Sequence, residues 1–356
     1  MAGKRKRKTL PKIFNELLES DDLSAMQQVF EACELEAYDS AYSKRTALLM
    51  PNCPESLARW LVARGANINA RDYHGQNALH IAAGSRRSLS LIIELGCDVH
   101  ACDSSGDTPL HAAADAKDVL AVESLLSAGS EIDAKNHEGL TPLEIGLRGC
   151  SNIEIIRMVD VAKVFLAAGA HKTAAMYGFV TRIGKNFEFH RAGFAKDSVR
   201  ATSRALASLC ELFDLKPPER RVMHEGESAI VVGGGSWREQ YKRLWQLLVP
   251  SKGNAATVQG EVLRISGRIS GEIFRNGGGN WDTCFTLMAR AFIKHVQDGC
   301  ALEENIVKEL NGIVNVIIRK RGDVDSDDYE RLEELAVEWI RRNPKPFNLG
   351  RVPYKR

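Results

Sequence analysis

Two carboxylates and two arginines in the second half of the chain are spaced to share one face of a single helix. The four residues are Glu261, Arg264, Arg268 and Glu272. Their intervals of 3, 4 and 4 residues make successive side chains neighbours on a helix surface. Carboxylates beside arginines could form a catalytic or anion-binding site, and Asn280 and Trp281 follow in a tight polar turn.

The same four charged residues also fit a structural interpretation. Neither a nucleophile nor a general base stands next to them, and an intrahelical ladder of salt bridges would have the same spacing. We therefore expect them to fix how this helix meets its neighbours. A partner-binding groove that includes Asn280 and Trp281, and an enzyme active site around the four charged residues, are the alternatives.

A glycine-rich run, Gly233-Gly234-Gly235-Ser236, precedes an expected helix. A dinucleotide-binding loop would need a further glycine where Arg238 stands, and a P-loop would need Gly-Lys followed by Ser or Thr. We therefore expect a loop whose Ser236 caps the next helix.

The eight cysteines are dispersed and form no C-x-x-C pair. Cys97 and Cys102 lie closest together, with His100 between them. A structural zinc site needs four such ligands, and no second pair is present. We expect neither a metal site nor a small-molecule cofactor.

The composition is that of a globular protein. The 356 residues, 44% apolar and 26% charged, suffice for two domains. A net charge of +2 makes nucleic acid an unexpected partner, and no run approaches the ~18 apolar residues of a membrane span. The basic run Lys4–Lys8 lacks the apolar core of a signal peptide. We expect a disordered basic tail at residues 1–9 and a cytoplasmic protein.

One phrase recurs along the first half of the chain. Its copies are Gly75-Gln76-Asn77-Ala78-Leu79-His80, Gly106-Asp107-Thr108-Pro109-Leu110-His111 and Gly139-Leu140-Thr141-Pro142-Leu143-Glu144. A weaker copy begins at Thr46, and the glycines that end successive copies, 65, 96 and 129, are 31 and 33 residues apart. The phrases resemble the ankyrin-repeat family over residues 42–172, and Thr108 to His111 match its T-P-L-H signature. The resemblance implies stacked helix pairs, histidines that hydrogen-bond backbone between repeats, and exposed turn tips that bind proteins.

The copies also depart from the family pattern. Lys44 stands where the first copy should have its turn glycine, and Leu49 and Glu144 replace the histidine. The last copy carries an insertion at residues 149–154. Residues 10–40 are predicted to be a pair of helices with a polar outer face that caps the stack.

The predicted fold class is all-α, with an ankyrin-repeat solenoid followed by a compact helical domain. The expected parts are a repeat domain with its cap at 10–175, a connector at 176–195, an all-α domain at 196–342 and an extended tail at 343–356. The second half resembles uncharacterised bacterial ankyrin-repeat proteins in two phrases, Thr257 to Glu261 and Asn280-Trp281-Asp282. That resemblance implies a bacterial origin and says nothing about an activity or a mechanism.

The predicted function is a protein-binding scaffold or adaptor without catalysis. The residues expected to contact the partner lie on turn tips and short-helix positions: Tyr73, His74, Gln76, Arg86, Arg87, Ser104, Asp107, Lys117, Asp118, His137 and Glu138. Tyr and Arg often dominate interface energies, and the pair Arg86-Arg87 suits a partner protein with an acidic surface. The alternatives are an immunity protein or inhibitor of a bacterial toxin, an effector acting on a host protein, and the enzyme considered above.

Overall fold

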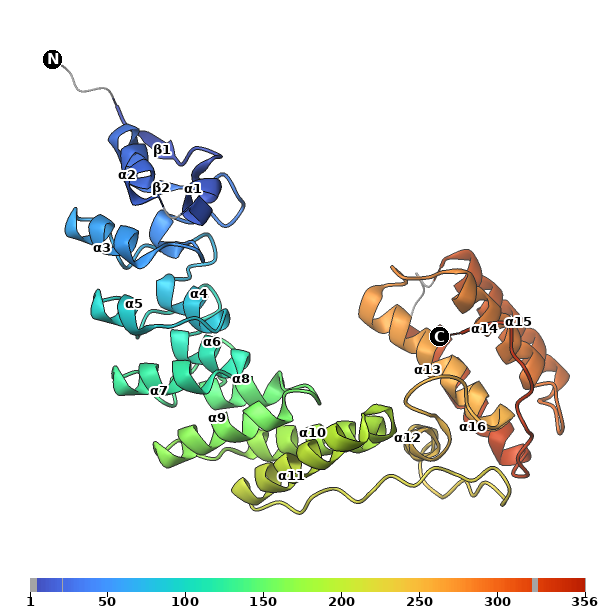
Figure 1. Cartoon of the computed structure of the whole chain (residues 1–356). Coiled ribbons are helices and arrows are strands. Elements are labelled where there is room, and N and C mark those ends of the chain that lie inside the picture. The colour runs from blue at the N-terminus through green and yellow to red at the C-terminus, as the bar shows by residue number, and fades with distance from the viewer. Residues whose placement is uncertain (1–4, 21, 322–325, 356) are drawn as a thin grey trace. The chain divides into compact units, whose positions relative to one another are not determined.

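The structure is a computed structural model that describes residues 5–20, 22–321 and 326–355 (Figure 1). The start of the expected basic tail, up to Lys4, lies outside the described residues. The chain divides into two compact units. The first comprises residues 1–187 and 195–218, and the second comprises residues 188–194 and 219–356.

The N-terminal cap of the first unit combines helices with a small sheet. Its elements are β1 (Arg7–Thr9), α1 (Phe14–Ser20), α2 (Leu23–Ala32) and β2 (Cys33–Tyr38). The cap core includes Phe14 and Phe30, whose rings meet edge to face with centroids 5.8 Å apart. The helix pair agrees with the predicted cap, whereas the two strands were not expected.

Residues 7–9 differ from the disordered tail predicted at 1–9. Strand β1 pairs in parallel with β2, and the Lys6 ammonium donates to the carbonyl oxygen of Phe30 at 2.6 Å. Charge repulsion within the basic run suggested a solvated tail. The backbone groups of β2 give part of that run a partner, and the sequence pattern did not show this pairing.

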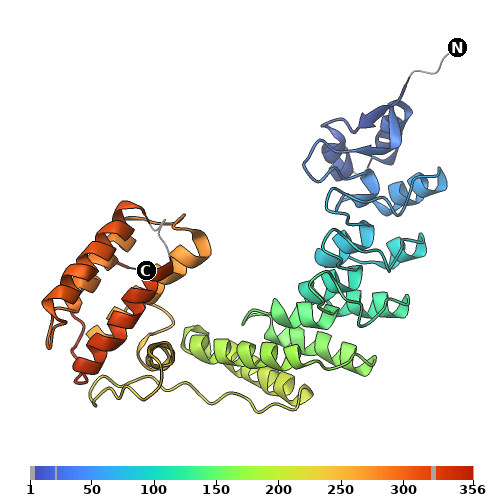
Figure 2. The same ribbon diagram turned by 180° about the vertical axis from the view of Figure 1, so that it is seen from behind.

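Helix pairs stack along the rest of the first unit (Figures 1 and 2). The elements in order are η1 (Ala47–Leu49) with α3 (Glu55–Ala63), α4 (Ala78–Gly84) with α5 (Ser90–Glu94), α6 (Pro109–Ala116) with α7 (Val119–Ser127), and α8 (Pro142–Arg148) with α9 (Ile155–Ala167). Helices α4, α6 and α8 pack on one another in sequence. Each pair is apolar on both faces and therefore buries its surface only by stacking on its neighbours.

Buried histidines link consecutive repeats. The backbone N–H of Thr108 donates to Nδ1 of His111 at 3.0 Å, and Nε2 of the same ring lies 3.1 Å from the carbonyl oxygen of Leu140. A carbonyl oxygen only accepts, so Nε2 carries the proton and the imidazole is neutral. His80 makes the equivalent bond to the carbonyl oxygen of Asp107 at 2.8 Å. The role implied by the ankyrin resemblance is therefore confirmed at both histidines.

Glu144 replaces the histidine in the last copy for a chemical reason. Its carboxylate accepts from the backbone N–H of Thr141 at 2.8 Å, as the imidazole does in the earlier copies. Its other oxygen accepts from the hydroxyl of Thr173 at 2.5 Å. The group beyond the last copy is thus a donor rather than a carbonyl, and a carboxylate suits it where an imidazole N–H suits the earlier copies.

Two long helices follow the repeats, α10 (Ala174–His190) and α11 (Lys196–Leu212). Helix α11 packs on α9, and residues 195–218 belong to the first unit. The structure therefore differs from the predicted connector at 176–195 and from a helical domain that begins at 196. Helix α10 buries Met176, Val180 and Ile183, whose spacing is helical. Gly184 within it leaves room for the Pro218 ring, since an added Cβ would lie 2.9 Å from Pro218 Cγ.

The second unit is built around one central helix, α13 (Val258–Asn276). Its neighbours are α12 (Trp237–Leu248), α14 (Thr283–His295) and α16 (Ser326–Arg342), while α15 (Glu304–Arg319) packs on α14 and α16. A short turn, η2 (Arg191–Gly193), precedes α11. Ser236 caps α12 by accepting from the backbone N–H of Glu239, as predicted. The segment after α16 is extended, and the Gln259 side chain on α13 donates to the carbonyl oxygens of Asn343 and Lys345. Among the described residues, no helix is long and apolar enough to cross a bilayer.

Replacing His111 with Glu should destabilise the repeats far more than replacing it with Gln. A carboxylate at this buried position would face the Leu140 carbonyl oxygen without a donor, at an expected cost of about 3–5 kcal/mol. A glutamine can accept from the Thr108 N–H and donate to the Leu140 oxygen. Denaturant unfolding of both variants measures the difference, and equal midpoints would contradict the proposed bonding.

The repeats should also lose stability as the pH falls below about 6.5. Burial lowers the pKa of both His80 and His111, so the unfolded chain takes up protons that the folded chain does not. Their contribution is therefore complete above the unfolded pKa and declines as the pH falls toward the lower folded pKa. Hydrogen exchange of the α4 and α6 amides at pH 7.5 and 5.5 measures this loss. The double variant His80→Gln/His111→Gln should show a smaller loss than wild type.

Candidate functional site

Three tight turns project from the repeat stack and form its fingertips, at residues 72–75, 103–106 and 136–139. Each begins with a side chain that accepts backbone N–H groups of its own turn. Asp72 Oδ1 accepts from His74 and Gln76 at 2.9 and 3.1 Å, and Asp103 and Asn136 do the same in the later turns. The side chains between these anchors are therefore held at defined positions.

Backbone hydrogen bonds join each fingertip to the one before it. The N–H of Tyr73 donates to the carbonyl oxygen of Ser43 at 2.8 Å, and that of Ser104 donates to His74 at 2.9 Å. The N–H of His137 continues the ladder to Ser105 at 3.0 Å. The tips thus form one continuous row.

An aromatic cluster of Tyr42, Tyr73 and His74 lies at the start of this row. The ring centroids of Tyr42 and Tyr73 are 4.6 Å apart, and those of Tyr73 and His74 are 5.8 Å apart. Both tyrosines are exposed, at 72% and 56% of their surface. Tyr73 and His74 are among the residues predicted from the sequence to contact a partner, whereas Tyr42 is not. Lys44 was the available signal, because it takes the left-handed conformation of a turn glycine, with φ of 50°, and so marks residues 42–44 as a tip.

A groove of about 430 Å³ runs beside the fingertips along α4, α6 and α8. Gln76 and Asp107, both expected to contact a partner, line it together with Asp103 and Asp115. Two arginines at its ends are paired with acids outside the groove. Arg45 lies 3.4 Å from Asp72, and Arg148 forms a two-pronged ion pair with Glu138. Asp115 is likewise paired, since its carboxylate lies 3.6 Å from the Lys117 ammonium, so Asp103 and Asp107 are the lining carboxylates for which the described residues show no ion pair.

The remaining tip residues are exposed. Ser104 donates from its hydroxyl to the carbonyl oxygen of His74 at 2.7 Å, and His137 and Glu138 face solvent at the last tip. The structure therefore brings most of the predicted tip residues together on one edge.

The predicted short-helix positions have other roles. The exposed Arg86 donates to the carbonyl oxygen of Ala116 in the next repeat at 2.7 Å, while Arg87 is exposed as expected. Asp118 caps α7 by accepting from the backbone N–H groups of Leu120 and Ala121. Arg86 and Asp118 thus contribute to the repeat stack itself.

Lys117 was expected on the exposed edge, and this prediction is wrong. Only 4% of the residue is exposed. It ends α6 in the left-handed conformation, and its ammonium lies 3.6 Å from an Asp115 oxygen and 4.0 Å from a Glu154 oxygen. Glu154 belongs to the insertion of the last copy, so an inserted segment provides a counter-charge for this buried lysine.

Glu261 and Arg264 form a buried ion pair in the second unit, with side chains 0% and 1% exposed. Two hydrogen bonds join the groups, Nε to Oε2 at 2.9 Å and Nη2 to Oε1 at 2.7 Å, and the Ala255 N–H also donates to Oε2. Neither side chain can contact a partner or a substrate in this state. The prediction that Glu261 and Arg264 belong to a second binding site or to an enzyme active site is therefore wrong. The structural role that was also expected fits both residues.

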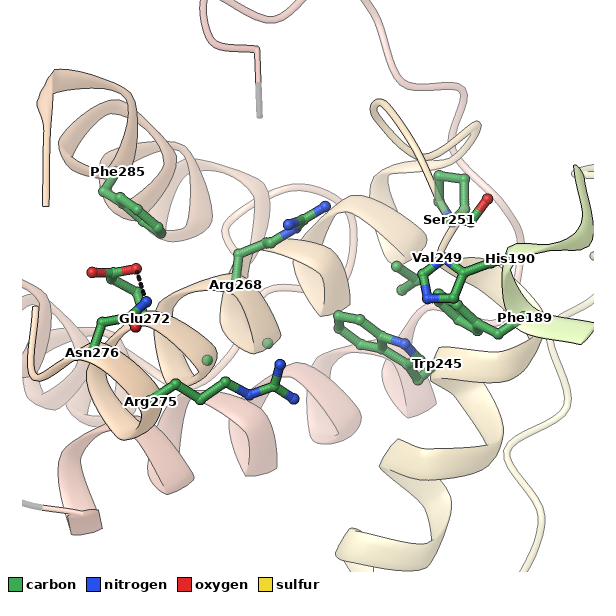
Figure 3. Close-up of a pocket in the computed structure, with 13 residues that line it drawn as sticks. Phe189, His190, Trp245, Val249, Ser251, Arg268, Glu272, Arg275, Asn276 and Phe285 are labelled. Carbon is green, nitrogen blue, oxygen red and sulfur yellow. Dashed lines mark hydrogen bonds between the residues drawn. The ribbon is translucent and has the colours of Figure 1, made fainter. Parts of the chain in front are cut away.

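The remaining residues of the predicted second site do not take part in this ion pair. They are Arg268, Glu272, Asn280 and Trp281. Arg268 and Glu272 line a pocket on α13, shown in Figure 3. Glu272 accepts from the Asn276 side chain at 2.9 Å and from the backbone N–H of Asn280 at 2.7 Å. Trp281 stacks on Phe285 with centroids 5.1 Å apart. The described residues contain no group of three or more histidine, cysteine or acidic side chains that could hold a metal ion.

Comparison with known families identifies the repeats. Two family models, each described as ankyrin repeats (many copies), match residues 61–113 and 110–159. The chain therefore contains ankyrin repeats, which are in general protein-interaction modules. A search of curated proteins found no match.

Replacing Glu261 with Gln should destabilise the second unit by about 3–5 kcal/mol, because the Arg264 charge would stay buried without its counter-charge. The double variant Glu261→Leu/Arg264→Met removes both charges and should be less destabilised than Glu261→Gln. Denaturant unfolding of the two variants measures the contrast. A Glu261→Gln variant as stable as wild type would contradict the burial of this pair.

Proposed function

We propose that this protein is a scaffold that holds a partner protein against its fingertip row and the adjoining groove. The observation that carries the proposal is the exposed cluster of Tyr42, Tyr73 and His74 on a row that backbone hydrogen bonds hold in place. An immunity protein, a toxin inhibitor and an effector would all use such a surface, and the identity of the partner separates these roles.

The two exposed tyrosines are suited to supply binding energy. Tyrosine buries a large area with few rotatable bonds and is enriched among residues that dominate binding energies. The ladder between fingertips fixes the backbone before binding, which lowers the entropy lost when a partner is bound. The cluster is therefore suited to anchor an interface.

The charge of the groove refines the class of partner. Asp103 and Asp107 line it, and Asp115, a third carboxylate of its wall, is paired with Lys117. The guanidinium of Arg86, one basis for the expected acidic partner, donates to the carbonyl oxygen of Ala116. Complementary charge favours binding and suppresses wrong partners. We therefore propose a partner that places basic side chains in the groove and an apolar or aromatic group against the two tyrosines.

The double variant Tyr42→Ala/Tyr73→Ala should weaken partner binding by ~2 kcal/mol or more, about 30-fold in Kd. Affinity capture with quantitative mass spectrometry identifies the proteins held by wild type, and titration of the purified partner gives Kd. The thermal melt should be unchanged, because both rings are exposed.

Leu120→Ala provides the matched control, since Leu120 is a large apolar residue of the same unit, 74% exposed on α7. It should retain the partner with the affinity of wild type. Full retention by the tyrosine variant, or equal loss in the Leu120 variant, would refute the fingertip site.

A further inference from the structure

A pocket of about 380 Å³ opens on α13 within the second unit. Its walls come from three further segments, which contribute Phe189 and His190, Trp245 at the end of α12, and Phe285 on α14 (Figure 3). Pockets of this size accommodate small organic molecules. The proposed protein interface lies on the first unit and does not involve these residues.

Two glycines form the floor of the pocket. A Cβ at Gly267 would lie 2.3 Å from Cζ3 of Trp245, so this glycine allows the indole to rest directly on α13. A Cβ at Gly271, one helical turn further on, would meet no atom within 4 Å. Gly271 therefore leaves open space beside the indole, and a larger side chain there would occupy it.

The aromatic wall is held rigidly. Trp245 and Phe189 are nearly parallel, with an interplanar angle of 14° and centroids 6.4 Å apart. Arg221 covers the Phe189 ring at 4.1 Å and donates to the carbonyl oxygens of Trp245 and Val249. Trp245 is only partly buried, which leaves part of the indole facing the pocket.

Positive charge collects in the same pocket. Arg268 and Arg275 are seven residues apart on α13, and Figure 3 shows both side chains reaching from that helix toward the side where Trp245 and His190 lie. One carboxylate, that of Glu272, lines the same pocket and accepts from the Asn276 side chain and from the backbone N–H of Asn280. Burial lowers the pKa of His190, and the charges of Arg221, Arg268 and Lys252 lower it further. Two arginines against one carboxylate give the pocket lining a net positive charge.

We propose that this pocket binds a nucleoside phosphate, with the phosphate held by Arg268 and Arg275 and the base against the indole of Trp245. A guanidinium group can donate two parallel N–H···O bonds to one phosphate, and arginine is therefore favoured at phosphate sites. A tryptophan ring can stack on any planar nucleobase, because stacking does not depend on which hydrogen-bonding groups the base carries. The pocket offers both features within one volume, beside a floor that Gly271 leaves open.

Isothermal titration of the full-length chain tests the proposal with ADP, GDP and CDP as probes. At least one of them should bind, and adenosine and inorganic pyrophosphate should each bind at least tenfold more weakly, because each has only half of the recognised chemistry. Absence of binding by all three nucleotides at millimolar concentration would overturn the proposal. Pyrophosphate binding as tight as that of the best nucleotide would overturn it too.

Three variants locate the bound nucleotide. Arg268→Gln should weaken binding at least tenfold by removing a cation, and Gly271→Leu should do so by filling the floor with a residue that helices favour. Arg290→Gln removes an exposed arginine of α14 outside the pocket lining and should bind as wild type does. Circular dichroism checks that each variant folds. Nucleotide binding unchanged in folded Arg268→Gln and Gly271→Leu would place the ligand elsewhere and refute the site.

Discussion

The hydrogen bond from a buried imidazole to the carbonyl oxygen of the next repeat governs the first unit. One ring satisfies two needs, since Nδ1 of His111 accepts from the helix N-terminus and Nε2 donates across to Leu140. The repeats must therefore keep a fixed separation, and the apolar helix faces between them are buried only at that separation. Where the next group is the Thr173 hydroxyl instead of a carbonyl, the residue changes to Glu144. The chemistry at each junction accounts for the residue found there.

Much of this unit could be predicted from the sequence, because the repeated phrase encodes local geometry. The histidines, the tip turns and the helix pairs all follow from residues close to one another in the chain. The pairing of β1 with β2 could not be predicted, since it joins residues more than twenty positions apart. The burial of Lys117 was missed because one of its two counter-charges, Glu154, comes from the insertion in the next repeat. Helix α10 was missed for another reason. Gly178, Gly184 and Thr181 weaken its helical signal, although Met176, Val180 and Ile183 kept a helical spacing.

In the second unit, the spacing of the charged residues predicted that they share a helix but not which of them are buried. The four charged residues do lie along one helix, as predicted, yet their environments diverge. The side chains of Glu261 and Arg264 are buried in the core as an ion pair, with 0% and 1% of their surface exposed. Arg268, one helical turn later, lines an open pocket instead. Burial depends on α16 and on the extended segment after it, whose approach to α13 no local pattern reveals. The glycines at 267 and 271 gave no signal in the sequence, since their value lies in what rests beside them.

The ladder that joins the fingertips consists of main-chain groups, from Tyr73 to Ser43, from Ser104 to His74 and from His137 to Ser105. Every amino acid except proline offers the same N–H and C=O groups. Most tip side chains can therefore be exchanged without removing a bond of the ladder, provided that the anchoring residues Asp72, Asp103 and Asn136 remain. The main-chain atoms of each tip therefore hold the row together, while its exposed side chains are available to bind a partner. During evolution, such a surface can acquire a new binding preference one substitution at a time while the scaffold beneath it persists.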